Sequence, residues 1–379
     1  MRRSVTAVLG VLALVAGSAS AAPAGSPFEG DSMWIWMVAR SSGGDPTAIA
    51  SQARRHGIEM VVVKGADGLT RWSQFSPSLV SQLEAGGLRV CAYQRVYGQY
   101  PRGEAVMGAR LVSAGADCLM IDAEGHYEGR YAQAQRYIRG LRGRIGGDYP
   151  VGLTSFPYVH YHPAFPYSVF LGPGGAQFNV PQMYWRAIGT TVDRIFSITY
   201  HYNRVFGRPI LPLGQVWQHP SPAEIQRFRQ LSQAYGATGA SWWDWQEARG
   251  RDWRALDAPL VAPFPVVAAY GYPVIGRRAR GDLVVWAQQH LRAAGVPVAV
   301  DGLFGAGTER SVRAFQALEG LPTEGAIGPR TWEALLRLAP ANVSWRATGA
   351  SAAALGERTG PRSAWLPARR NELDRVGAR

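Results

Sequence analysis

The chain has 379 residues, of which 47% are hydrophobic and 18% are charged, so it can bury the core of more than one globular domain. A formal net charge of +13 favours acidic partners, but no nucleic-acid-binding motif or clustered basic face accompanies it, and we expect no nucleic-acid partner. Its two cysteines exclude a small disulfide-dense scaffold.

The first residues have the pattern of a secretory signal. Arg2 and Arg3 precede an apolar run over residues 5–16, which is too short to span a bilayer, and residues 19–21 form a small-x-small cleavage site. We therefore predict a signal peptide over residues 1–21 and a secreted, extracellular or wall-associated protein. No cysteine follows the apolar run, so we expect no membrane anchor.

Short apolar runs alternate with helical patterns from residue 28 to residue 258. The runs are nearly continuous, as in parallel strands that are covered on both faces. A helix start between two of them carries Ser221 and Glu224, the spacing of a capping box. This alternation predicts an α/β fold, a (β/α)8 TIM barrel, with an open doubly wound sheet as the alternative. The predicted strands cover residues 33–38, 58–64, 88–94, 117–124, 149–155, 179–185, 209–216 and 239–246.

Polar side chains gather where these predicted strands end, which is the active face of a barrel. Asp122 and Glu124 are the sharpest pair, because residues two apart on a strand point to the same face. Two close carboxylates do not readily both ionise, so one is expected to stay protonated and to serve as an acid. Tyr184 is a further catalytic candidate. The substrate-binding candidates are Lys64, the only lysine, with Tyr93, Gln94, Gln182, Trp185, Gln215, Trp243 and Asp244.

No cofactor or metal site is expected. His160 and His162 could supply half of a metal site, but no further ligand cluster accompanies them. Cys91 and Cys118 fall on neighbouring predicted strands, slightly offset. We expect two buried free thiols, with a disulfide as the alternative, in a monomeric protein.

Three segments follow the predicted barrel. Residues 259–271 contain three prolines and no helical period, and are expected to be a linker. Residues 272–338 form a second unit, a small three-helix α domain. Residues 339–379 are rich in Ala, Gly, Ser and Arg, and are expected to be a basic disordered tail.

The second unit nearly repeats itself. Asp301-Gly302 precedes Thr308 by seven residues, and Glu324-Gly325 precedes Thr331 by seven. Together with Gln288, Phe315, Gln316, Gly320 and Trp332, this pattern resembles the peptidoglycan-binding domain 1 family. The resemblance implies that cell-wall glycan is the partner.

The predicted barrel resembles glycoside hydrolases of the chitinase-like and Chalaropsis-lysozyme-like kind. The resemblance lies in residues 119–124, in Met183 and Tyr184, and in the Trp-rich last strand. It implies hydrolysis of an N-acetylhexosamine polymer such as peptidoglycan or chitin, in which Glu124 is the acid and Asp122 orients the acetamido group. The chitinase-like motif has an aspartate where this chain has Met120, between Asp117 and Asp122. The first predicted strand lacks the aspartate that is expected in the lysozyme-like family. The alternative is therefore a non-catalytic wall-binding protein with a degenerate barrel.

Overall fold

A computed structural model describes residues 27–260 and 271–345. The predicted signal peptide, most of the predicted linker and the predicted tail beyond residue 345 lie outside these ranges.

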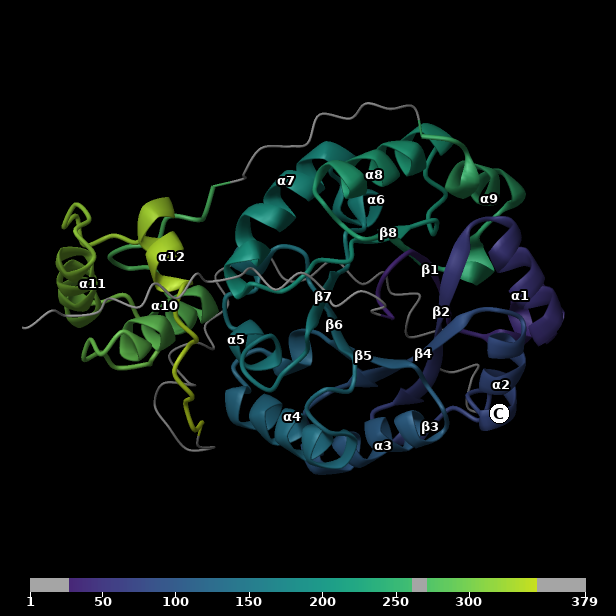
Figure 1. Cartoon of the computed structure of the whole chain (residues 1–379), viewed down its shortest axis with the longest axis horizontal. Helices are drawn as coiled ribbons and strands as arrows, with labels where there is room; N and C mark the ends of the chain where they lie inside the picture. Colours follow the sequence, from purple (N-terminus) through teal and green to yellow (C-terminus); the bar gives the residue numbers. More distant parts are fainter. Residues whose placement is uncertain (1–26, 261–270, 346–379) are drawn as a thin grey trace, which may run out of the picture.

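Within residues 27–260, eight parallel strands form a nearly closed barrel surrounded by helices (Figure 1). Neighbouring strands follow the order β7-β6-β5-β4-β2-β1-β9-β8, and two single bridges, Asn179 to Ile210 and Gln182 to Leu213, join the two ends. The predicted (β/α)8 barrel is thus confirmed, and the open sheet is excluded. The strands are β1 (Asp31–Ile35), β2 (Ile58–Asp67), β4 (Arg89–Val96), β5 (Cys118–Ala123), β6 (Val151–Ser155), β7 (Phe178–Pro181), β8 (Leu213–Gln215) and β9 (Ser241–Trp243), while β3 (Thr70–Arg71) pairs antiparallel with β2.

Helices cover the outer face of the strands. Several begin at a proline preceded by a capping side chain: Asp45 accepts the N–H of Thr47 at 2.9 Å, and Ser221 forms the predicted capping box with Glu224. The helices of this layer are α1 (Pro46–Arg55), α2 (Pro77–Ala85), α3 (Pro101–Ser113), α4 (Tyr131–Ile145), α5 (Tyr167–Phe170), α6 (Trp185–Ile188), α7 (Val192–Asn203), α8 (Pro222–Ala234) and α9 (Gly250–Asp257).

Alternate residues of each strand face the barrel interior, which is a packed core. On β5, Cys118 and Met120 join the interior cluster, whereas Leu119 and Ile121 pack against the helices. Both faces are therefore buried, which is why these strands have nearly continuous apolar sequences. The next inward position on β5 is Asp122, where the interior cluster gives way to polar side chains.

The two cysteines lie inside this core. They are directly opposite each other on β4 and β5, with their Cα atoms 4.6 Å apart, and they form a disulfide. The expectation of two free thiols is therefore wrong, and the alternative, a disulfide, is found. The two positions were expected to be offset, but the strand register brings Cys91 and Cys118 level, within the Cα distance that a disulfide requires.

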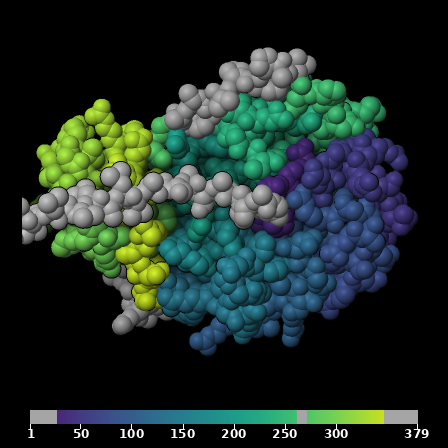
Figure 2. Space-filling view, viewed as in Figure 1, coloured from purple at the N-terminus to yellow at the C-terminus, as the bar shows by residue number. Residues whose placement is uncertain are grey.

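Among residues 271–345, three helices form a small lobe beside the barrel (Figures 1 and 2): α10 (Asp282–Ala293), α11 (Ala306–Leu318) and α12 (Pro329–Leu335). The sequence repeat is also a hydrogen-bond repeat. Gln288 donates to Thr308 at 3.0 Å and accepts the N–H of Gly302 at 2.9 Å. Gln316 donates to Thr331 at 3.1 Å and accepts the N–H of Gly325 at 2.9 Å. Each glutamine thus holds one acidic-Gly turn against its helix.

The beginning of α10 docks on the barrel. The carboxylate of Asp282, which is fully buried, accepts the N–H and the O–H of Ser168 at 2.7 and 2.6 Å. The N–H of Asp282 donates to the carbonyl of Pro163 at 2.7 Å. One turn further along, the indole of Trp286 donates to the carbonyl of Val205 at 2.7 Å. Because these polar groups are buried and hydrogen-bonded, α10 docks on the barrel in one specific position.

A second contact follows α12. The side chain of Gln135 on α4 donates to the carbonyl of Val343 at 2.6 Å and accepts the N–H of Trp345 at 3.0 Å, while the Trp345 ring lies 4.4 Å from that of Tyr131. Val343 and Trp345, which belong to the predicted disordered tail of residues 339–379, are therefore packed against the barrel.

Candidate active site

Two buried carboxylates lie at the end of β5, in the mouth of the barrel. Asp122 and Glu124 are 5% and 3% exposed. The amide of Gln182, at the end of β7, donates to both of them, at 3.3 Å to Asp122 and 3.1 Å to Glu124. Three predicted site residues from two strands are thus brought together.

Arg95 on β4 lies between the two carboxylates. It donates to Asp122 Oδ1 at 3.1 Å and to Glu124 Oε2 at 2.9 Å, and it makes a second ion-pair contact with Glu124 Oε1. Burial opposes the charged form of Arg95, but the two carboxylates outweigh it and hold its pKa well above its ordinary value. The two carboxylates are therefore not the isolated acid pair that the sequence suggested, because one guanidinium supplies a positive charge and hydrogen-bond donors to both.

Sequence reasoning missed Arg95 because the predicted strand ended at residue 94, two residues before the end of β4 at Val96. Tyr93 faces the interior, so the alternation directs Arg95 inward and Gln94 outward. Gln94 is fully buried and donates to the carbonyls of Gly68 and Glu104, at 3.1 and 2.9 Å. It therefore lies outside the mouth, and the predicted substrate contact is corrected.

A second ion-paired group surrounds Lys64 at the end of β2. The ammonium lies 2.7 Å from Asp67, and 5.1 and 5.3 Å from the ring centroids of Trp72 and Tyr93. The hydroxyl of Tyr97 donates to the other oxygen of Asp67 at 2.5 Å. Burial favours protonation of Asp67, but Lys64 and Tyr97 outweigh it and lower its pKa. Asp67 and Tyr97 were not predicted, since both lie beyond the expected strand ends.

Partly exposed aromatic rings lie at or just after the ends of several strands. The rings of Trp36 and Trp72 are 6.5 Å apart, and those of Tyr184 and Trp217 are 6.3 Å apart. Trp243 lies 6.1 Å from the buried ring of Tyr93. Such rings offer flat apolar surfaces beside hydrogen-bonding groups, the usual character of a binding cleft.

Three other predicted contacts are buried and hydrogen-bonded within the protein. Trp185 is fully buried on the outer face, where its indole donates to Glu224 at 3.0 Å, so it does not line the mouth. Gln215, also fully buried, donates to the carbonyl of Trp217 at 2.7 Å and accepts the N–H of Arg186 at 2.9 Å. Asp244 is 2% exposed and accepts from Gln246 at 3.1 Å.

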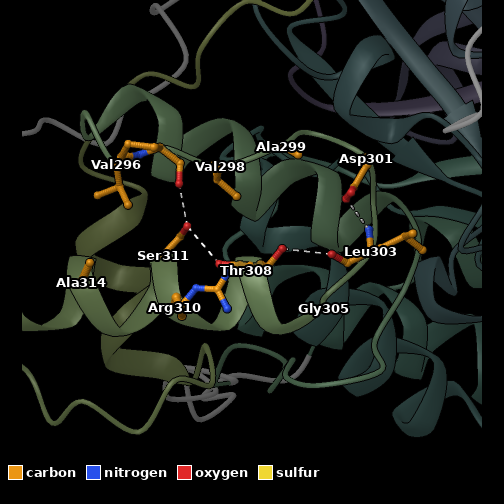
Figure 3. Close-up of a pocket in the computed structure, with 12 residues that line it drawn as sticks. Val296, Val298, Ala299, Asp301, Leu303, Gly305, Thr308, Arg310, Ser311 and Ala314 are labelled. Carbon is orange, nitrogen blue, oxygen red and sulfur yellow. Dashed lines mark hydrogen bonds between the residues drawn. The ribbon is translucent and has the colours of Figure 1, made fainter.

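The C-terminal lobe has a groove of its own, of about 670 Å³, between α11 and the chain before it (Figure 3). Ser311 donates to the carbonyl of Pro297 at 2.7 Å, and Thr308 donates to that of Leu303 at 3.0 Å, so both hydroxyls bind the opposite wall. Arg310 and Leu303 are exposed at its rim. The groove is a second candidate contact surface.

Residues 280–335 match the family described as putative peptidoglycan binding domain. The C-terminal domain belongs to this family. A search of curated proteins returned no match. In the described part of the chain, no helix is long and apolar enough to cross a membrane.

Solved structures resemble the two parts of the chain separately. A peptidoglycan-binding protein from Clostridioides difficile is 40% identical over 17% of this chain and 40% of its own, with a TM-score of 0.17. The SleB N-terminal domain is 39% identical over 17% of this chain and 90% of its own, also at 0.17. The spore cortex-lytic enzyme SleL from Bacillus cereus is 9% identical over 60% of this chain and 73% of its own, with a TM-score of 0.46. The chain thus spans less than half the length of the first of these proteins.

Proposed function

We propose that this protein is a secreted glycoside hydrolase that acts on an N-acetylhexosamine-containing cell-wall polymer. The supporting observation is the pair of buried carboxylates, Asp122 and Glu124, in an aromatic-lined barrel mouth within a chain that also carries a peptidoglycan-binding domain. The C-terminal domain brings the barrel to the wall, and the mouth receives a glycan chain.

In this proposal, substrate entry separates Arg95 from Glu124. Glu124 then takes up a proton and donates it to the glycosidic oxygen. Asp122 keeps its contact with Arg95, stays ionised and orients the acetamido group of the substrate, with Tyr184 as a nearby hydrogen-bonding group. The acetamido oxygen attacks the anomeric carbon as the glycosidic bond breaks, and a water molecule then opens this intermediate and returns a proton to Glu124. This is the substrate-assisted exception to the usual two-carboxylate scheme.

A second candidate is a non-catalytic glycan-binding protein. The observation that favours it is the two-point contact between Arg95 and Glu124, which stabilises the ionised carboxylate and so opposes a proton-donor role. Under this alternative the ion-paired groups are hydrogen-bonding partners for sugar hydroxyls only.

One assay separates the two candidates. Purified protein is incubated with peptidoglycan and with N-acetylglucosamine oligomers, and soluble products are identified by mass spectrometry. New reducing ends that wild type releases and Glu124→Gln does not would support the hydrolase. Binding without release of any fragment would support the non-catalytic candidate.

A further inference from the structure

Partly exposed rings line the loop after β6, outside the carboxylate pair. Phe156 and His162 stack, with centroids 3.4 Å apart and planes 6° apart. His160 stacks on Tyr202 of α7 at 4.0 Å and 17°. Tyr161 is 51% exposed and lies 4.4 Å from the His160 ring. We call these five residues the aromatic row.

The loop has a buried core of its own, against which Phe156 and Tyr202 of the aromatic row also pack. Its buried side chains, Tyr158, Val159 and Phe165, already pack into the barrel's outer hydrophobic cluster. Leaving large rings accessible forgoes the stabilisation that burial would give. Burial, with smaller effects from His201 and His162, lowers the pKa of His160 to about 4, so its ring is neutral at pH 7. The His160–Tyr202 stack is then an uncharged surface.

The Phe156–His162 stack adjoins the two candidate binding regions. Phe156 follows β6, and its ring lies 3.9 Å from the position that a Cβ would occupy on Gly125, the residue after Glu124. Pro163, which follows His162 directly, accepts the N–H of Asp282, the first residue of α10. The stack therefore lies between the residue after Glu124 and the beginning of the C-terminal domain, and His160, Tyr161 and Tyr202 form a second ring group on the same loop and on α7.

We propose that the aromatic row is a distal glycan-binding subsite, which holds sugar rings that have passed beyond the barrel mouth. The ligand is a chain of several N-acetylhexosamine residues, whose apolar faces match the aromatic rings and whose hydroxyls match the Glu128 carboxylate that contacts His162 at 2.8 Å. The identity of this polymer rests on the proposed function, but binding at the row does not require catalysis. A chain too short to leave the mouth would not reach it.

Calorimetric titration of the full chain with N-acetylglucosamine oligomers of two and six residues tests this. Tyr161→Ala and Tyr202→Ala should each weaken binding of the six-residue oligomer by about five- to ten-fold, as truncation of an aromatic contact residue does, and should leave the two-residue oligomer unaffected. Tyr161→Phe keeps the ring and should bind as wild type does. Tyr100→Ala is the matched control, because Tyr100 is 64% exposed on the loop after β4.

Unchanged binding of the six-residue oligomer by both alanine variants would overturn the proposal, as would a wild type with equal affinity for the two lengths. Thermal unfolding of each variant identifies any loss that arises from misfolding. If binding depends on the aromatic row while wild type cleaves nothing, this inference stands and the proposed hydrolase fails.

Discussion

At the scale of single residues, Arg95 determines what the barrel mouth can do. Asp122 and Glu124 could be chosen from the sequence because their spacing places both on one face of a strand. The strand register, which the sequence does not reveal, decides which cation meets them. Because the predicted strand stopped at Gln94 instead of Val96, it left out Arg95, and the expected isolated acid pair is an ion-paired cluster in the structure.

Glu124→Gln should lower the rate of glycan cleavage by about 10²–10⁴-fold, because glutamine keeps the shape of the side chain but has no proton to donate. Binding of the polymer should persist. The measurement is the initial rate of release of reducing ends, with the exposed Glu333→Gln as control. Equal rates for wild type and Glu124→Gln would remove Glu124 from the acid role.

Arg95→Met should destabilise the protein by about 3–5 kcal/mol at pH 7, because it leaves two buried carboxylates without their cation. The loss should shrink at pH 4, where these carboxylates can take up protons. Urea unfolding of wild type and variant at both pH values measures the difference. A loss of the same size at pH 4 would show that missing packing, rather than missing charge, is responsible.

At the scale of elements, local signals predicted helix starts better than side-chain roles. The capping box formed by Ser221 and Glu224 could be recognised in the sequence because its two residues are three positions apart. The contact between Glu224 and Trp185 could not be recognised in the sequence, because the two residues are 39 positions apart and only the closure of the barrel brings them together. A strand-end tryptophan that looks like a sugar contact therefore fixes the start of α8 instead.

Glu224→Gln should weaken this junction by on the order of 1 kcal/mol at pH 7. Burial opposes ionisation of Glu224, but hydrogen bonds from Arg186, Ser221 and Trp185 outweigh it and lower its pKa to about 2. A lowered pKa stabilises the fold fully above the ordinary value of 4.5, and this stabilisation is lost as the pH falls towards 2. The gap in Tm between wild type and variant should therefore narrow between pH 5 and pH 3, and a constant gap would contradict the assignment.

At the scale of the whole molecule, the sequence predicted two domains and their order, but not their contact. The proline-rich residues 259–271 suggested a tether between independent units. Nothing in the sequence marks Asp282 or Trp286 as contacts with another domain, since such a contact leaves no periodic pattern. Only the fold shows that both meet the barrel, through Ser168 and Val205.

Asp282→Ala should loosen the C-terminal domain from the barrel. The N–H and the O–H of Ser168 would lose their acceptor, and an unsatisfied buried donor costs about 1–3 kcal/mol. Calorimetry should record one unfolding transition for wild type and an earlier, separate one for the variant. Glu333→Ala, at an exposed position of the same domain, should behave like wild type. A variant that still unfolds as one unit at the wild-type temperature would show that the other contacts hold the domains together.

The docking of α10 on the barrel fixes the distance between the barrel mouth and the groove of the C-terminal domain. If the mouth and the C-terminal groove engage one glycan strand, a fixed number of sugar units must separate the gripped position from the bond that is cut. The fragments released would then have one predominant length instead of a wide range of lengths. The Asp282→Ala variant, in which α10 is less firmly docked, would release fragments with a broader distribution of lengths.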